Sequence, residues 1–282
     1  MIKLVDRIIE LALEEDIKSG DITTDAIIPD DALGQADFLV KEDGVIAGLE
    51  VVERIFRIFD ENLSFQKYFE DGAAVSKGTK VASVTGNISS ILKTERTALN
   101  FLQRMSGIAT LTSKYVKEVS GTGVKILDTR KTAPGLRITD KMAVKLGGAE
   151  NHRIGLFDMY LIKDNHIKAA GSIKKAAELV RAHQSQEESA YKIEIEVSSP
   201  DQIEEAVSAG ADVIMLDNFT PAMMREAVKQ INRRALVEAS GGITLETIRE
   251  YAETGIDYIS TGALTHSAKA LDISMKITSS DA

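Results

Sequence analysis

Polar side chains cluster where predicted strands end in the second half of the chain. The ends are either rich in charge or are glycine-containing turns: Asp128-Thr129-Arg130-Lys131, Lys163-Asp164-Asn165-His166, Asp217-Asn218, Ser240-Gly241-Gly242 and Thr261-Gly262-Ala263. Guanidinium and ammonium groups bind carboxylates and phosphates, and glycine turns let backbone N–H groups approach a phosphate. The pattern predicts an enzyme acting on a phosphorylated, multiply anionic small molecule.

The segment Ile193–Val197, which reads IEIEV, is the sharpest local signal. Alternate residues of a strand face opposite sides. Glu194 and Glu196 therefore share one side, and they face the interior if the apolar residues pack against helices. A buried carboxylate needs a cation, and Lys131, Lys163 or a metal ion could serve. The alternative is an edge strand with a solvated face.

The remaining candidates are assigned by the chemistry of their side chains. We expect four cations to clamp the anionic groups: Arg130, Lys131, Arg153 and Lys163. Glu196 and Asp217 would hold hydroxyls or Mg²⁺. His152 and Arg153 form either a surface pair or part of the strand-end rim, whereas His183 and His266 are expected to be structural. No zinc-site spacing and no serine nucleophile elbow occurs.

These residues need a scaffold that brings strand ends together. Strands are predicted at 124–127, 159–162, 192–197, 212–216, 235–238 and 257–260, with helical patterns between most of them. This alternation predicts parallel pairing through right-handed crossovers. Because no glycine-rich dinucleotide motif is present, a β/α barrel is favoured over a doubly wound sheet. Barrels carry function at the C-terminal ends of their strands.

The first half of the chain follows a different pattern. It combines a helix at 4–13, strand-like runs at 36–41, 45–47 and 80–84, a helix at 51–59, and a helix with apolar positions from Ile91 to Met105. We therefore predict an α/β protein with an N-terminal α/β domain, residues 1–121, and a β/α barrel catalytic domain, residues 122–265. Residues 266–282 are assigned to the first domain.

Composition limits the class of protein. The chain has 282 residues, of which 44% are hydrophobic, and its net charge of −9 argues against a nucleic-acid partner. Residues 128–168 nevertheless hold eight basic and five acidic residues, which favours a local anion site as much as a mixed solvated face. No apolar run could span a membrane and no signal peptide is recognised. The absence of cysteine fits a reducing cytoplasm.

The order and spacing of several motifs resemble the quinolinate phosphoribosyltransferase family. They cover almost the whole chain: ALEEDIKSGDITTDAIIP, ERTALNFLQRMSGIAT, LDTRKTAPGLR, GGAENHRIGLFDMYLIKDNH, IEIEV, IMLDN, EASGG and STGALTHS. The resemblance implies an N-terminal α/β sandwich and a partly open, seven-stranded barrel of the type II phosphoribosyltransferase kind. It also implies transfer of a phosphoribosyl group from phosphoribosyl pyrophosphate (PRPP) to quinolinate with decarboxylation, in de novo NAD biosynthesis.

The resemblance also implies roles for individual residues. Quinolinate would contact Arg96, Thr129, Arg130, His152, Arg153 and Lys163. PRPP would contact Lys131, Glu196, Asp217, Ser240, Gly241, Gly242, Thr261, Gly262 and Ala263. Lys131, Lys163, Glu196 and Asp217 would be catalytic, with Mg²⁺ held directly or indirectly by Glu196 and Asp217 and no organic cofactor. Arg96 would reach the site from the second subunit of a homodimer, or of a higher oligomer.

Three alternatives share parts of this pattern. A molybdenum-transport-associated relative shares the fold, but the intact Lys163–His166 segment favours the transferase. A transferase for nicotinate would bind one carboxylate and would need fewer cations than Arg130, Arg153 and Lys163 provide. A non-catalytic phosphate-binding barrel would avoid inward carboxylates. One departure from the family is Ala149 where a third glycine is common, and a methyl group there disfavours positive φ.

Overall fold

Two compact units make up the computed structural model, which describes residues 2–187 and 190–281. The first comprises Met1–Ser113, Thr132–Gly148 and Leu264–Ala282, and the second comprises Lys114–Lys131 and Ala149–Ala263. Residues 114–121, 132–148 and 264–265 are thus grouped differently from the predicted domains. Met1 and Ala282, at the ends of the predicted first domain and tail, lie outside the described residues.

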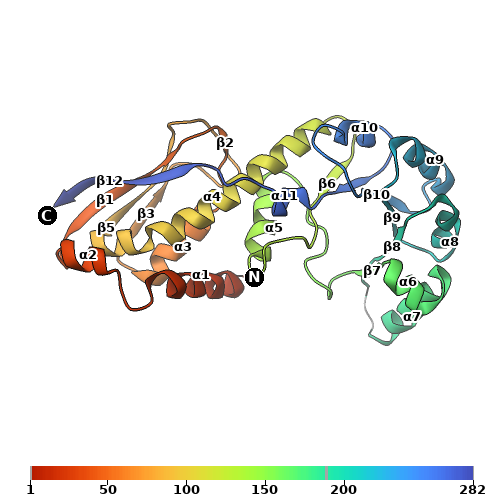
Figure 1. The fold of residues 1–282 in the computed structure, drawn as a ribbon, viewed down its shortest axis with the longest axis horizontal. Coiled ribbons are helices and arrows are strands. Elements are labelled where there is room, and N and C mark those ends of the chain that lie inside the picture. The colour runs from red at the N-terminus through yellow and green to blue at the C-terminus, as the bar shows by residue number, and fades with distance from the viewer. Residues whose placement is uncertain (1, 188–189, 282) are drawn as a thin grey trace. The chain divides into compact units, whose positions relative to one another are not determined.

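A four-stranded sheet with the order β12-β1-β5-β3, hereafter the antiparallel sheet, forms the centre of the first unit (Figure 1). Its strands are β1 (Leu33–Val40), β3 (Ser64–Lys67), β5 (Lys80–Asn87) and β12 (Ile273–Asp281), and a separate ribbon joins β2 (Gly44–Val45) to β4 (Ala74–Val75). β12 pairs with β1 along its whole length. The C-terminal segment therefore belongs to this sheet, although sequence reading gave it no strand.

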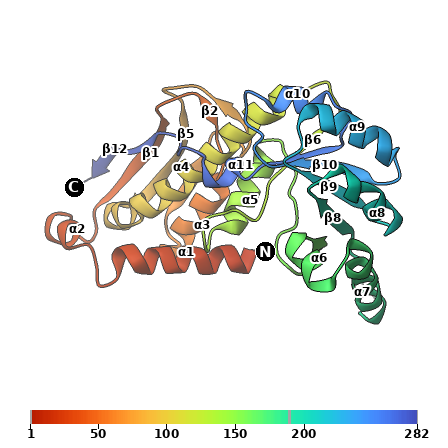
Figure 2. The ribbon, with the colours of Figure 1, turned by 45° about the vertical axis from the view of Figure 1, so that its right-hand side comes forward.

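Helices accompany this sheet in the first unit. They are α1 (Ile2–Ile17), α2 (Ile22–Ile27), α3 (Leu49–Phe59), α4 (Ile88–Glu118), α5 (Arg137–Leu146) and α11 (Ala263–His266). Helices α3 and α4 lie along the sheet in both views (Figures 1 and 2). The rings of Phe38, Phe56 and Phe65 meet between α3 and the sheet, with centroids 5.6–6.1 Å apart.

The physical reason for the regrouped segments lies in α4 and α5. Helix α4 has 31 residues and ends at Glu118, before the predicted boundary at residue 121. The units divide inside this helix, between Ser113 and Lys114, so residues 114–118 continue a helix of the first unit but are grouped with the second. Helix α5 is tied to the first unit because Arg104 of α4 donates two hydrogen bonds of 2.8 Å to the buried carboxylate of Asp140. Neither feature has a signal in a local sequence pattern.

The second unit is built on a six-stranded parallel sheet with the order β6-β11-β10-β9-β8-β7. The strands are β6 (Lys125–Leu127), β7 (Tyr160–Ile162), β8 (Ile193–Val197), β9 (Val213–Asp217), β10 (Leu236–Ser240) and β11 (Tyr258–Ser260), and every pairing is parallel. The helices are α6 (Asp164–Ala170), α7 (Ile173–Gln186), the 3₁₀ helix η1 (Pro200–Gln202), α8 (Ile203–Ser208), α9 (Pro221–Ile231) and α10 (Ile248–Ala252). The predicted strands and their parallel pairing are confirmed, and α8 packs against β8 and β9 (Figure 2).

The seventh strand expected from the resemblance is reduced to one residue pair. Glu150 forms an isolated parallel bridge with Leu127, donating its N–H to the carbonyl of Ile126 and accepting from Asp128. The pairing does not continue, because the N–H of His152 donates to the side chain of Asp128 at 2.9 Å. This explains why the sequence showed six strands.

Two local features concern segments singled out in the sequence. Lys163 directly follows β7, as predicted, and Asp164, Asn165 and His166 form the first turn of helix α6. His166 Nδ1 accepts the N–H of Lys163 at 2.9 Å, so this histidine closes the start of the helix. Ala149 does not have a positive φ; the left-handed turn falls on Gly148, with φ of 92°. The alanine is therefore accommodated without strain.

Candidate active site

A pocket of about 400 Å³ lies at the carboxyl ends of the parallel strands. Its lining residues all belong to the second unit: Thr129, Arg130, Lys131, His152, Arg153, Leu161, Lys163, Glu196, Met215, Asp217, Ser240, Gly241 and Ser260. Parallel strands present their carboxyl ends at one edge. Most of the residues chosen from sequence for that reason therefore meet in one cavity.

Positive charge dominates one side of this pocket. Arg153 is partly buried, and its Nη1 donates to the carbonyl of Met159 at 3.3 Å, which fixes the guanidinium. Burial, and then the nearby charge of Arg130, lower the pKa of Arg153. Like charges held together in this way favour an anion between them. The guanidinium fork suits a planar carboxylate.

Glu196 and Lys163 form the closest ion pair of the pocket. Lys163 Nζ lies 2.5 Å from Glu196 Oε2, and the side chains are 43% and 14% exposed. The pair joins neighbouring strands, because Ile162 of β7 is in register with Ile195 of β8. Lys163 is one of the three candidate partners, with Lys131 and a metal ion, that the IEIEV pattern suggested for a buried carboxylate. The contact makes Glu196 an interior carboxylate and excludes the solvated edge strand.

The end of β9 supplies a second carboxylate beside a glycine turn. Asp217 is in register with Ser240 of β10, and Asn218 donates its N–H to the Ser240 carbonyl at 2.8 Å. Gly241 has φ of 90°, and an added Cβ would lie 2.3 Å from Asn218 Oδ1. A glycine is needed here because no side chain fits between the strand ends. Asp217, Ser240 and Gly241 all line the pocket.

Several predicted residues lie outside the lining. Gly242, Thr261, Gly262 and Ala263 are not among the pocket residues. The Thr261 N–H donates to the carbonyl of Leu127, and the Ala263 N–H donates to the Thr261 hydroxyl, so these two donors are already engaged. Arg96 is an exposed residue of α4 in the first unit.

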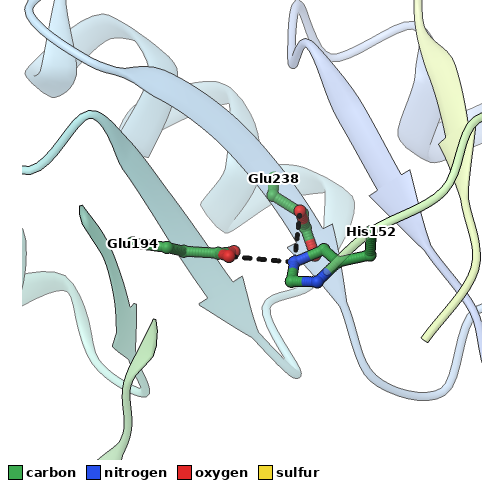
Figure 3. A group of neighbouring side chains, drawn as sticks. All are labelled: His152, Glu194 and Glu238. Atoms are coloured by element: carbon green, nitrogen blue, oxygen red, sulfur yellow. Dashed lines mark hydrogen bonds and ion pairs between the residues drawn. The ribbon is translucent and has the colours of Figure 1, made fainter. Parts of the chain in front are cut away.

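His152 lines the pocket and contacts two buried carboxyl groups, Glu194, which was predicted to face the interior, and Glu238, which was given no role (Figure 3). Its Nε2 lies 2.9 Å from Glu194 Oε2 and 3.6 Å from Glu238 Oε2. The side chains of Glu194 and Glu238 are only 1% and 2% exposed, and neither lines the pocket. Burial, and then the charge of Glu194, raise the pKa of Glu238 well above its ordinary value.

Asp128 is the other residue whose role the sequence did not reveal. It is fully buried, and its carboxylate accepts the His152 N–H at 2.9 Å and the Asn151 side-chain amide at 2.7 Å. It therefore fixes the backbone that carries His152. A charged residue directly after an apolar strand was the available signal for Asp128, and a glutamate within the apolar run LVEAS was the signal for Glu238.

Glu196 and Asp217 are the groups suited to a magnesium ion. Both carboxylates line the pocket from adjacent strands, β8 and β9. Mg²⁺ prefers oxygen ligands and is commonly held by one or two carboxylates together with substrate phosphates. The donor set therefore fits this ion.

Comparisons with known proteins agree over nearly the whole chain. Residues 21–106 match the N-terminal domain model of quinolinate phosphoribosyl transferase, and residues 108–276 match the C-terminal domain model. The chain belongs to the quinolinate phosphoribosyltransferase family. It is thus an enzyme of the phosphoribosyltransferase type, as the motifs indicated.

Individual relatives cover both units. Quinolinate phosphoribosyltransferase [decarboxylating] 2b of Nicotiana tabacum is 47% identical, with 96% of this chain and 81% of that protein covered. The probable nicotinate-nucleotide pyrophosphorylase [carboxylating] of Bacillus subtilis is 43% identical, with 95% and 91% covered. The crystal structure of NadC from Streptococcus pyogenes superposes with a TM-score of 0.92 at 41% identity, covering 99% of each chain.

A more distant structure marks the limit of this likeness. Human nicotinic acid phosphoribosyltransferase superposes with a TM-score of 0.62 at 12% identity, over 92% of this chain and 73% of that chain. This similarity shows a shared fold alone. Separately, none of the helices in residues 2–187 and 190–281 is long and apolar enough to cross a membrane.

Proposed function

We propose that the pocket transfers the phosphoribosyl group of PRPP to the ring nitrogen of quinolinate. The 2-carboxylate then leaves as CO₂, and the products are nicotinate mononucleotide and pyrophosphate, within de novo NAD biosynthesis. The observation that carries this proposal is one cavity in which Arg130, Arg153 and Lys163 face two carboxylates, Glu196 and Asp217. A dicarboxylate needs the cations, and a ribose phosphate with a metal ion needs the carboxylates.

Quinolinate is assigned to the cationic side of the pocket. Its two adjacent carboxylates would contact Thr129, Arg130, His152, Arg153 and Lys163, which all line the cavity. The lowered pKa of Arg153 supports this, because an anion placed between Arg130 and Arg153 relieves their repulsion. Nicotinate has a single carboxylate and would leave part of this charge unmatched.

PRPP is assigned to the side formed by β8, β9 and β10. Lys131 would contact the pyrophosphate, and Ser240 and Gly241 would receive the 5′-phosphate at their turn. Gly242, Thr261, Gly262 and Ala263 stay in this assignment as neighbours of that turn, although the Thr261 and Ala263 donors are engaged within the protein.

Glu196 and Asp217 are proposed to hold Mg²⁺, which would neutralise the pyrophosphate and orient the ribose hydroxyls. As the pyrophosphate leaves, positive charge develops on the ribose ring, and these carboxylates stabilise it electrostatically. Attack by the ring nitrogen creates a pyridinium, which accepts the electron pair of the departing carboxylate. Lys163, paired with Glu196 at 2.5 Å, would lie beside both substrates.

Arg96 is proposed to complete the quinolinate pocket from a second subunit. It is exposed on α4. Its surroundings within one subunit do not indicate a function for this arginine. A symmetric dimer that shares two such sites would give it one. We also propose a cytoplasmic location, which the absence of cysteine supports.

The experiment that tests this function follows the carboxyl carbon. Quinolinate labelled at the 2-carboxylate is incubated with the enzyme, PRPP and Mg²⁺, and released CO₂ and nicotinate mononucleotide are counted. We expect equal amounts of both, dependent on PRPP. Nicotinate offered as acceptor serves as the control. No release from quinolinate, with product formed from nicotinate, would contradict the proposal.

A further inference from the structure

Glu194 and Glu238 form a buried carboxyl pair behind the pocket for which the proposed reaction has no use. They belong to β8 and β10, the two strands that flank β9, and both point toward His152 (Figure 3). Each retains one oxygen, Oε1, that is buried and has no hydrogen-bond partner among the described residues. Such atoms cost stability. A fold that keeps two of them beside a pocket residue points to a role at the pocket.

The two carboxyl groups lie close together beside His152. Ligand atoms of His152, Glu194 and Glu238 all lie within 4.8 Å of one another, and both glutamate side chains are buried. Two ionised carboxylates this close in a buried site would repel each other. Burial, and then the charge of Glu194, raise the pKa of Glu238 well above its ordinary value, which favours the neutral form of this carboxyl group. Glu194 is the member of the pair that lies within hydrogen-bonding distance of the histidine.

His152 is held by contacts of its ring and of its backbone. Its Nε2 lies 2.9 Å from Glu194 Oε2, which is a hydrogen-bonding distance. The distance from Nε2 to Glu238 Oε2 is 3.6 Å, which is too long for a hydrogen bond. Its backbone N–H is fixed by Asp128 on the other side. The ring is therefore held from two directions, and it lies between the buried pair and the pocket that it helps to line.

We propose that Glu194 is a positioning residue that holds His152 with a proton on Nε2 and its ring fixed at the pocket wall, while Glu238, at 3.6 Å from Nε2, lies beyond hydrogen-bonding distance of the ring. A histidine beside an accepting carboxylate has its tautomer and ring orientation defined. Such a ring faces the anionic substrate without reorganising. The inference rests on the proposed function, in which His152 contacts quinolinate.

The same three groups have the composition of a metal site, since their ligand atoms lie within 4.8 Å of one another. A divalent ion would require both carboxylates to be ionised and Nε2 to be unprotonated. A hydrogen bond across the 2.9 Å between Nε2 and Glu194 Oε2 requires a proton on Nε2 instead. The two arrangements exclude each other, so a test for bound metal distinguishes them.

The proposal predicts an asymmetry between two substitutions of the same kind. Glu194→Gln removes the charge that His152 faces, and loss of a charged hydrogen bond should raise the KM for quinolinate about tenfold or more. The KM for PRPP should stay within about twofold. Glu238 lies beyond hydrogen-bonding distance of Nε2, so in Glu238→Gln both constants should stay within about threefold of the wild type.

Asp212→Asn is the matched control. Asp212 Oδ2 accepts the N–H of Ile193 at 2.7 Å, at the opposite end of β8 from the pocket, and it does not line the cavity. It should alter neither KM. Equal effects of Glu194→Gln and Glu238→Gln, or equal changes in both KM values, would overturn the proposal.

A spectroscopic measurement tests the hydrogen bond even if a variant folds poorly. The chain has four histidines, so nitrogen-15 labelling of histidine gives few signals, and a His152→Gln sample identifies those of His152. In the wild-type protein we expect Nε2 of His152 to be protonated, and we expect this signal to change in Glu194→Gln but not in Glu238→Gln. An unprotonated Nε2 would overturn the proposal, as would one equivalent of tightly bound divalent metal that is lost in His152→Gln.

The two experiments separate this inference from the function on which it rests. A wild-type enzyme that releases no CO₂ would remove the proposed function, while the nitrogen signals would still report the tautomer. An active wild-type enzyme whose Glu194→Gln variant matches Glu238→Gln would remove only the positioning role.

Discussion

Carboxylates on the strands of the two sheets have opposite surroundings. In the antiparallel sheet, Asp37 of β1 receives Gln35 Nε2 at 3.0 Å on one oxygen and Lys80 Nζ at 2.9 Å on the other. In the parallel sheet, Glu194 and Glu238 each keep a buried oxygen without a partner among the described residues. Glu196 and Asp217 face a cavity.

Buried polar atoms without partners indicate where the molecule binds ligands. Both oxygens of Asp37 have partners within the chain. A buried oxygen left unpaired costs about 1–3 kcal/mol, and two such oxygens lie on the glutamates beside His152, which lines the pocket. Ligand binding is therefore expected in the second unit.

Removal of Mg²⁺ should abolish turnover entirely. If Mg²⁺ joins Glu196 and Asp217 to the pyrophosphate, EDTA should reduce CO₂ release to background, and an excess of Mg²⁺ should restore it. The circular dichroism spectrum should not change, because the proposed ion contacts substrate more than fold. Full activity in EDTA would contradict the metal-binding role of these two carboxylates.

Arg153→Ala should come next in size. The variant loses a fork that pairs with a substrate carboxylate in a partly buried pocket, so kcat/KM for quinolinate should fall about a hundredfold to a thousandfold. PRPP binding should change little, because Arg153 lies on the other side of the pocket. Steady-state kinetics and isothermal titration with PRPP provide the two measurements.

Arg54→Ala offers a control from the first unit. Arg54 donates to both oxygens of Asp6, at 2.5 and 2.6 Å, and so has its carboxylate within the chain. Its loss should leave quinolinate kinetics unchanged. A similar fall in kcat/KM for both variants would show that global stability, and not substrate binding, is being measured.

The sequence could predict much of the parallel sheet because its strands are short apolar runs between turns, and the polar ends then identified the pocket. It could not predict β12, since its pairing with β1 joins segments some 240 residues apart without any local signal. Glu238 was missed for a similar reason: only the strand order places β8 and β10 on either side of β9. Thr261 was chosen correctly as a strand-end residue, but the engagement of its N–H by Leu127 depends on register.

Mixed dimers should recover part of the activity that two inactive variants lack. Arg96 belongs to the first unit and Arg130 to the second, so the proposed shared site draws one residue from each subunit. In a random mixture of Arg96→Ala and Arg130→Ala subunits, half of the dimers are mixed, and each has one intact site. About a quarter of wild-type activity should return. Each variant refolded alone provides the control, and no gain on mixing would place both arginines in one subunit's site.

The smallest effect concerns stability and has opposite signs in the two units. In the first unit, the pKa of Asp60 is lowered from 3.8, chiefly by the hydroxyl of Ser90, which donates at 2.8 Å. That contribution is present above 3.8 and is lost as the pH falls through the lowered value. In the second unit, the pKa of Glu238 is raised above 4.5 by burial and by Glu194. Its contribution is present below 4.5 and is lost as the pH rises through the raised value.

Thermal unfolding of wild type and two variants over a range of pH separates these contributions. Relative to Asp60→Asn, the wild type should lose Tm on the acid side, because the unfolded chain binds a proton that folded Asp60 resists. Relative to Glu238→Gln, it should lose Tm as the pH rises above 4.5, because folded Glu238 keeps a proton that the unfolded chain releases. Parallel curves for wild type and Glu238→Gln would mean that Glu238 is ionised in the folded protein. The raised pKa of Glu238, which is the clearest difference between the carboxyl groups of the two sheets, would then be contradicted.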